Sequence, residues 1–183
     1  MEKAADEDLV RQYVESGELR HVDTLVRRHI TKVRAMLYSM VLNDDDADDL
    51  AQEVFCRAIA AIHGFNGRSA FSTWIHRIAV NTALNFLRRR KRNPVETREE
   101  LPDAPAARHS QPDETVMARE QDHQVATALA ELTPNLRVAI VLTCIQGLSV
   151  REAAKAANCP AGTMYWRVHQ ARKHLRKKIP EDG

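Results

Sequence analysis

The chain has 183 residues, of which 44% are hydrophobic and 28% charged, with a formal net charge of +2. This composition can bury a core and excludes a wholly disordered chain. Six Gly and 5% aromatic residues favour helices over sheets. No stretch reaches the roughly 20 apolar residues of a membrane span, so we expect a protein not embedded in a membrane. Three cysteines without paired or metal-ligand spacing, and no secretory signal, predict a reducing compartment and a cytoplasmic protein.

Apolar residues at helical spacing predict four amphipathic helices in the first half of the chain. Ser16–Gly17 marks the first turn, a dense block of Asp precedes the third helix, and a loop over residues 63–70 precedes the fourth. Carboxylates at a helix start also suit the positive end of the helix dipole. The predicted buried stripes are Leu9, Val10, Tyr13 and Val14; Leu25, Val26, Ile30, Val33 and Leu37; Leu50, Val54, Ala58 and Ile62; and Trp74, Ile75, Ile78, Thr82 and Phe86.

A proline-rich segment divides the sequence. Four of the seven prolines lie between Asn93 and Pro112, with mixed charges and little apolar periodicity. This composition predicts a semi-extended, flexible linker over 93–113. Helical patterning resumes near Glu114. We therefore expect an all-α protein of two small helical domains, residues 1–92 and 114–179.

The second domain carries the signals of a helix-turn-helix. Thr133 and Pro134 predict an N-cap followed by proline at the first helical position, and the helix they start should bury Val138, Val141, Leu142 and Ile145. Ser149 and Glu152 have the spacing of a capping box, which starts a short helix through Ala157. A turn then leads to a last helix over about 161–178. Two helices joined by a short turn are typical of this motif.

The last helix predicts one buried and one basic face. Its buried stripe is Met164, Val168, Ala171 and Leu175, and its opposite face is Trp166, His169, Gln170, Lys173 and Lys177, flanked by Arg167, His174, Tyr165 and Arg172. Such a face suits the DNA major groove. The alternative is an ordinary amphipathic helix with solvated cations. An exposed Trp166 argues against it, because a large ring on a solvated face usually has a partner.

Aromatic and basic residues gather around the fourth predicted helix. Phe65, Phe71 and Trp74 surround its start, Asn81 follows, and Arg88–Arg92 is an unbroken basic run. Aromatic faces beside cations can stack unpaired bases and neutralise phosphates. An amide such as that of Asn81 can read the edge of an extruded base. For Phe71 and Trp74, packing in the core is an equally good interpretation.

Several motifs together resemble one family. Phe65–Leu87 looks like the promoter-melting segment of bacterial sigma-70 factors, within the small extracytoplasmic-function (ECF) group. Asp46–Ala58 is similar to that group's core-polymerase-binding helix. Leu132–Leu142 and Gly147–Ala154, followed by Gly162–Thr163, resemble its C-terminal domain. The motifs occur in the family's order and cover nearly the whole chain apart from the linker.

The resemblance implies a sigma factor that directs core RNA polymerase to promoters and assists DNA melting. Residues 1–92 would be sigma region 2 and residues 114–179 sigma region 4. The partners would be the polymerase β′ clamp helices and β flap, promoter DNA, and a cognate anti-sigma factor. The implied sites are Asp48, Asp49, Gln52 and Glu53 for core polymerase; Phe65, Asn66, Ser69, Phe71, Trp74, Asn81, Arg88, Arg89 and Arg90 for the −10 element; and Thr163, Tyr165, Trp166, Arg167, His169, Gln170 and Lys173 for the −35 element.

The family likeness implies no catalytic residue, no metal and no cofactor, since nucleotidyl transfer belongs to the core enzyme. Tyr165, Trp166 and Gln170 occupy positions where the family usually has small or basic residues, so the −35 sequence does not follow from relatives. Two other functions remain open. An operator-binding regulator that never contacts polymerase would explain the second domain alone. A metal-dependent helical enzyme would need ligand spacings that the eight His and three Cys do not show.

Overall fold

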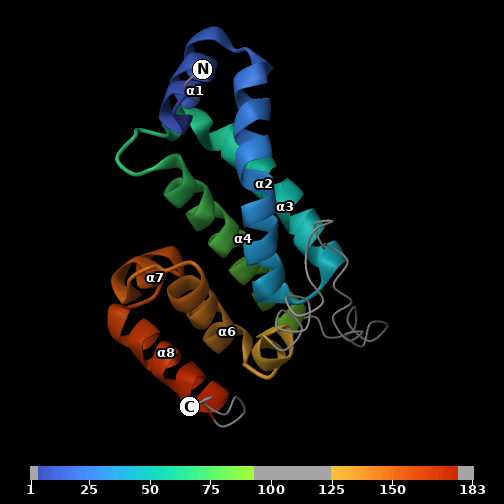
Figure 1. The fold of residues 1–183 in the computed structure, drawn as a ribbon, viewed down its shortest axis with the longest axis vertical. Helices are drawn as coiled ribbons and strands as arrows, with labels where there is room; N and C mark the ends of the chain where they lie inside the picture. The colour runs from blue at the N-terminus through green and yellow to red at the C-terminus, as the bar shows by residue number, and fades with distance from the viewer. Residues whose placement is uncertain (1–3, 93–124, 177–183) are drawn as a thin grey trace, which may run out of the picture.

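The computed structural model describes residues 4–92 and 125–176, and within these ranges every regular element is a helix. The all-α prediction is therefore confirmed (Figure 1). The predicted linker over 93–113 and residues 114–124 of the helical pattern that follows it lie outside the described residues. The elements are α1 (Asp6–Ser16), α2 (Leu19–Val41), α3 (Asp44–Ala61), the single 3₁₀ turn η1 (Ile62–Gly64), α4 (Phe71–Arg92), an unlabelled helix over 125–130, α6 (Pro134–Ile140), the π-helical turn η3 (Val141–Ile145), α7 (Val150–Ala156) and α8 (Ala161–Arg176).

Local signals explain the helix ends of the first domain. Gly17 adopts a left-handed conformation at φ 71°, and its N–H donates to the Tyr13 carbonyl at 2.8 Å, which closes α1. Asn43 caps α3, because its side-chain oxygen accepts a hydrogen bond from the Asp46 N–H at 2.8 Å. The Asp block forms the first turn of α3, as predicted from the helix dipole.

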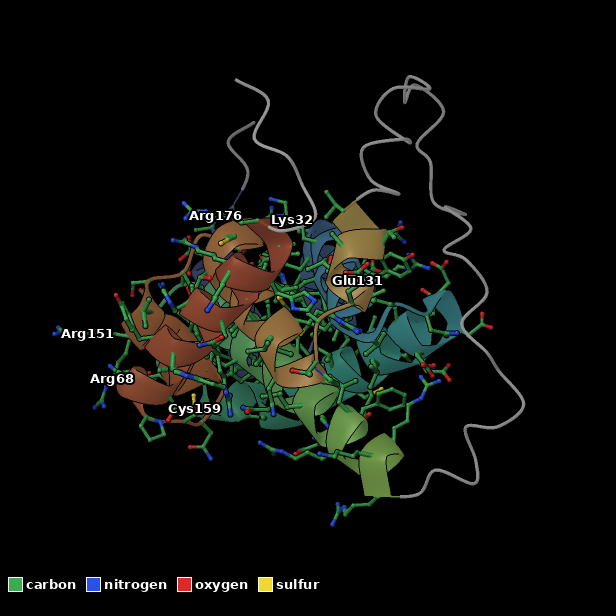
Figure 2. The ribbon with its side chains drawn as sticks, turned by 90° about the horizontal axis from the view of Figure 1, so that it is seen from below. Lys32, Arg68, Glu131, Arg151, Cys159 and Arg176 are labelled. Atoms are coloured by element: carbon green, nitrogen blue, oxygen red, sulfur yellow. The ribbon has the colours of Figure 1, made fainter. Side chains whose placement is uncertain are left out.

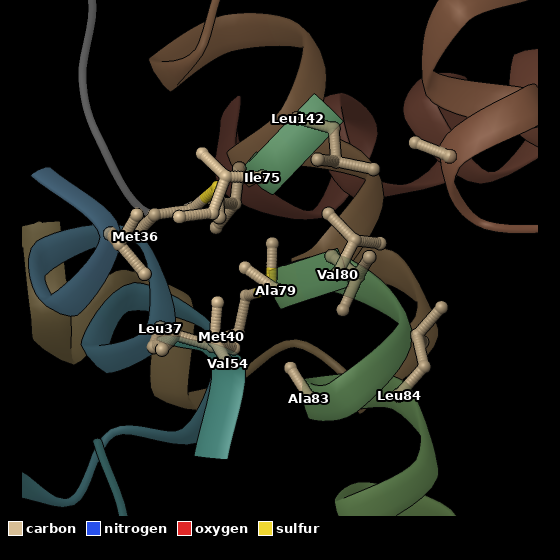
Figure 3. Packing of buried hydrophobic residues seen from close by; sticks show 14 of the residues in the cluster. Met36, Leu37, Met40, Val54, Ile75, Ala79, Val80, Ala83, Leu84 and Leu142 are labelled. Atoms are coloured by element: carbon tan, nitrogen blue, oxygen red, sulfur yellow. The ribbon is translucent and has the colours of Figure 1, made fainter. Parts of the chain in front are cut away.

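The core of the first domain lies where α2, α3 and α4 pack together. Met36, Leu37 and Met40 of α2 converge with Val54 of α3 and Ile75 of α4 (Figure 3). The predicted stripe on α4 is too narrow, because Ala79, Val80, Ala83 and Leu84 are also buried. The reason is that α4 packs against α2 and α3 and also contacts α7 of the second domain. The apolar periodicity of one helix does not show that a further helix packs on another of its faces.

Two residues of the predicted stripes are exposed. Val14 lies outside the buried face of α1, which consists of Leu9 and Val10 with Tyr13 packed beside them. Ile145 is 46% exposed. It belongs to η3, where the Gln146 N–H donates to the Val141 carbonyl at 2.9 Å, five residues back. This wider turn carries Ile145 away from the face that an uninterrupted α-helix would bury.

The second domain follows the predicted helix-turn-helix. Ser149 and Glu152 form the capping box that starts α7, and α8 begins at Ala161 as expected. Ala153, Ala154 and Ala157 are buried, and α7 packs on α8. Small side chains allow this close crossing. The N-cap prediction at Thr133 is correct in position only, because no side-chain hydrogen bond caps the helix. The Thr133 backbone carbonyl accepts hydrogen bonds from the Leu136 and Arg137 N–H groups.

The two domains contact each other through α2 with α6 and η3 and through α4 with α7. Leu142 of η3 belongs to the same buried cluster as the α2 and α4 residues (Figure 3). Arg137 of α6 is only 9% exposed. Its guanidinium donates to the Leu129 carbonyl at 2.9 Å, the Leu132 carbonyl at 3.2 Å and the Ala130 carbonyl at 3.4 Å, and across the domain boundary to the Met40 carbonyl at 3.1 Å. Burial lowers the pKa of Arg137, yet a guanidinium stays charged in proteins.

Candidate promoter and polymerase interfaces

The acidic surface of α3 contains the four residues predicted to bind core polymerase. Asp48, Asp49 and Gln52 are exposed and Glu53 is half-buried. Positions 48 and 52, like 49 and 53, are one helical turn apart and therefore share a face. Glu53 pairs with Arg57 at 2.5 Å, four residues along the same helix. The four side chains thus form one continuous polar surface with three carboxylates.

Arg34 of α2 forms ion pairs at one end of this surface. The Arg34 guanidinium hydrogen-bonds Asp48 and also donates to Asp44 at 2.7 Å. The hydrogen bond to Asp48 is the main cause that raises the pKa of Arg34. Asp48 therefore has a partner within the protein, whereas Asp49 and Gln52 face solvent on the same surface.

Three aromatic rings meet where the 65–70 loop enters α4. The Phe65 ring lies edge-on to Phe71, with centroids 5.8 Å apart, and tilted to Trp74 at 5.4 Å. Phe71 and Trp74 are 5.6 Å apart. Phe71 is only 3% exposed, while Phe65 and Trp74 are half-buried. We refer to Phe65, Phe71 and Trp74 as the aromatic cluster. It combines a buried central ring with two rings that remain partly open.

The loop beside the aromatic cluster is short and exposed. Gly67 takes a left-handed conformation at φ 67°, which favours glycine. The Asn66 side-chain oxygen accepts a hydrogen bond from the Arg68 N–H at 3.2 Å and so tightens the turn. Ser69 is half-buried, and Arg68 lies at the edge of the molecule and points outward (Figure 2). The loop that joins Phe65 to Phe71 therefore carries an exposed, outward-pointing cation.

The polar residues predicted along α4 fall into two groups. Asn81, Arg88 and Arg89 are exposed, as DNA contact requires. Arg90 instead donates to Asp46 of α3 at 2.8 Å and is half-buried. This ion pair joins the end of α4 to the start of α3. Sequence reasoning missed it because the partners are 44 positions apart.

The orientation predicted for α8 is confirmed. Met164, Val168 and Ala171 are buried and Leu175 packs beside them, whereas Tyr165 is 68% and Trp166 57% exposed. His169 and Lys173 are also exposed, and Thr163, Arg167 and Gln170 are half-buried. Lys177 lies outside the described residues. We refer to the seven predicted residues on this helix as the α8 surface. It presents two large aromatic rings among cationic and polar side chains.

The sequence comparisons identify the family. Residues 25–93 match the family Sigma-70 region 2, and residues 122–175 match Sigma-70, region 4. The chain is 34% identical over 181 residues to the RNA polymerase sigma-H factor of Pseudomonas aeruginosa, covering 95% of this chain and 93% of that protein. It is 35% identical over 185 residues to the ECF RNA polymerase sigma-E factor of Escherichia coli K12, covering 97% and 96%. This chain belongs to the ECF group of sigma-70 factors.

The solved structures agree with this assignment. The sigma factor RpoE from Bartonella quintana, crystallised in complex with the anti-sigma factor NepR, superimposes with a TM-score of 0.69 at 25% identity, over 88% of this chain and 98% of that one. The protein is therefore an alternative sigma factor that acts with RNA polymerase in transcription initiation. In the part of the chain that the structure describes, no helix is both long and apolar enough to cross a membrane.

The region 2 match begins at residue 25, so helix α1 of this sigma factor precedes it. Two acidic residues of α1 nevertheless contact the aromatic cluster and its neighbours. Glu7 accepts a hydrogen bond from the Phe71 N–H, and Asp6 contacts His29, whose ring packs on Phe71. The sequence carries no local signal for either contact. Acidic residues in a first helical turn predict only a dipole interaction.

Proposed function

We propose that this sigma factor recognises promoters with two separate surfaces and binds core polymerase with a third. The aromatic cluster, the adjoining loop and Asn81 would capture a base extruded from the −10 element, with Arg88 and Arg89 on neighbouring phosphates. The α8 surface would read the −35 element in the major groove. The exposed carboxylates and amide of α3 would bind the β′ clamp helices, and the second domain would bind the β flap.

The observation that carries this proposal is the arrangement and partial exposure of the rings in the aromatic cluster. Its rings contact one another edge-on or tilted and form a platform in which Phe71 is buried, while Phe65 and Trp74 remain partly open. An exposed amide and exposed arginines follow on the same helix. Base stacking on an aromatic side chain contributes about 1–3 kcal/mol per base. Such a platform therefore suits unpaired DNA better than a duplex.

The deciding experiment measures open-complex formation by permanganate footprinting with reconstituted holoenzyme on a promoter selected from genomic DNA. Asn81→Ala should slow opening while leaving the affinity for core polymerase unchanged. Asn135→Ala removes an exposed amide of the second domain and is the matched control. Normal opening by Asn81→Ala would remove this residue from the −10 site. Equal loss of opening and core affinity would indicate a folding defect instead.

The polymerase interface is tested separately by core-binding titrations with fluorescently labelled protein. Asp49→Ala and Gln52→Ala should weaken core binding, because both side chains are exposed on the acidic surface of α3. Glu15→Ala, an exposed carboxylate on α1, is the control for loss of charge. Specific duplex binding without any association with core would favour an operator-binding regulator and overturn the proposal.

The remaining parts of the proposal concern control and compartment. We infer that an anti-sigma factor binds this chain, which is supported by the similar Bartonella quintana protein crystallised with one. We also infer that the protein acts in the cytoplasm, where polymerase is, and performs no bond-making step itself. Within the described ranges no group of His, Cys, Asp or Glu is arranged to hold a metal ion, so nothing there supports a metal-dependent enzyme.

A further inference from the structure

The start of α4 is capped by a residue from α1. The first N–H groups of a helix have no partner within it, and a side chain usually satisfies one of them. Here the preceding residue is Ala70, which has no polar side chain. The Phe71 N–H instead donates to a Glu7 carboxylate oxygen at 3.1 Å, from a residue 64 positions earlier. A carboxylate at this end also complements the helix dipole.

Asp6, a second acidic residue of α1, holds the His29 ring that packs on Phe71. Asp6 Oδ2 lies 2.7 Å from His29 Nε2, and Asp6 Oδ1 accepts from Arg28 at 2.7 Å. The His29 ring is 5.4 Å from the Phe71 ring, tilted by 57°. Burial acts to raise the pKa of Asp6, but hydrogen bonds from Arg28 and His29 outweigh it, so the pKa lies below its usual 3.8. Asp6 is therefore ionised at neutral pH and accepts hydrogen bonds from both side chains.

Phe71 is the residue through which these contacts reach the proposed DNA site. Its ring contacts the rings of His29, Phe65 and Trp74. It is also the first residue of α4, directly after the loop. A shift of the Phe71 backbone would therefore move the two open rings and the end of the loop together.

We infer that α1 is a positioning element for promoter opening, with Glu7 and Asp6 as its positioning residues. They touch no DNA themselves. They set the backbone and ring of Phe71, and through Phe71 the orientation of Phe65 and Trp74. This inference rests on the proposed function of the aromatic cluster. It assigns a role to a helix that lies before the region 2 match.

The first test is spectroscopic and needs no polymerase. The two tryptophans are Trp74 and Trp166, so Trp166→Phe leaves Trp74 as the single reporter within the aromatic cluster. In this background Glu7→Ala should increase acrylamide quenching of Trp74 while the helical circular dichroism stays unchanged. Glu15→Ala, an exposed glutamate on the same helix, is the matched control and should alter neither signal. Unchanged quenching in Glu7→Ala would contradict the inference.

The second test is a double-mutant cycle on the rate of open-complex formation with holoenzyme. Glu7→Ala should slow opening about fivefold, which corresponds to the roughly 1 kcal/mol of a lost helix cap. Glu7→Gln keeps an acceptor oxygen and should restore most of the rate. If Glu7 acts through the aromatic cluster, Glu7→Ala should add little in a Phe65→Ala background, because coupled residues are non-additive.

The outcomes separate the inference from the proposed function. Additive effects of Glu7→Ala and Phe65→Ala, or normal opening by Glu7→Ala beside impaired opening by Phe65→Ala, would overturn the role of α1. Normal opening by Phe65→Ala would overturn the proposed −10 site instead. If Glu7→Ala does not fold, Asp6→Asn replaces it in the same cycle, and additivity there contradicts the inference equally.

Discussion

The aromatic cluster and the α8 surface differ in how the fold holds their side chains. The aromatic cluster depends on α1, α2, the 65–70 loop and α4, and its central ring is buried. The α8 surface comes from one helix, and its two aromatic rings are largely exposed. A surface ordered by folding needs little further ordering on binding. A surface on a single helix can change its side chains, and hence its specificity, with little effect on stability.

The largest expected effect on stability is at the buried ring of the aromatic cluster. Phe71→Ala should destabilise the first domain by about 3–5 kcal/mol, the usual cost of removing a buried Phe. Trp166→Ala should change stability by no more than about 0.5 kcal/mol, as is common for exposed positions. Urea denaturation of both variants measures the difference. Similar losses in the two variants would show that the α8 surface is as integral to the fold as the aromatic cluster.

A smaller effect tests the support beneath the α8 surface. Ser149 and Glu152 start α7, which packs on α8. Ser149→Ala should cost about 1 kcal/mol, as typical for a lost N-cap. Thr133→Ala is the matched control, because the Thr133 side chain caps nothing. The measurement is the urea midpoint of each variant. An equal loss in both would mean that N-cap position rather than the hydrogen bond matters.

The electrostatic part of the α8 surface gives a third prediction. Lys173→Ala should weaken promoter binding by holoenzyme and lower the slope of log K against log salt by about 1, as expected for one lost phosphate contact. Tyr165→Ala should weaken binding without changing that slope, because it removes no charge. Filter-binding titrations at several salt concentrations measure both. An unchanged slope in Lys173→Ala would place this lysine away from the phosphates.

The smallest effect is a pH dependence confined to the first domain. Burial, with the nearby His29 and Lys32, lowers the pKa of His76 below its ordinary 6.5. As pH falls below 6.5, the unfolded chain takes up this proton before the folded one, so the free energy of unfolding should decrease. His76→Gln should reduce that decrease. Denaturation curves between pH 7 and 5 of the original protein and this variant measure it, and an unchanged decrease would contradict the prediction.

The sequence predicts those parts of the structure that depend on local chemistry. The capping box at Ser149, the start of α8 and its buried face follow from signals within one or two helical turns. The wider burial of α4 and the exposure of Ile145 do not, because they depend on a second domain and on a π-helical turn. The contacts of Glu7, Arg90 and Arg137 were missed because their partners lie 64, 44 and 97 positions away in the sequence.

The candidate sites also differ in how far local sequence patterns predict them. For the α8 surface, periodicity alone predicts which side chains face outward, and exposed Trp166 agrees with it. For α3 and α4, the resemblance to the family names the residues, but no local pattern shows that Asp48 and Arg90 already have partners within the protein. Whether each residue contacts DNA or polymerase remains a prediction for the experiments above.

The hydrogen bonds of Arg137 bear on how easily the two halves of the protein can part. Three of its four carbonyl partners belong to its own domain, and only the Met40 carbonyl lies across the boundary. Met40 is in the last turn of α2, where carbonyls have no partner within the helix and water can replace a lost donor. Separation would therefore leave the guanidinium largely bonded and strand no buried charge. For Arg137, parting the domains costs one hydrogen bond, whereas the apolar cluster that Leu142 shares with α2 and α4 would lose its cover on both sides.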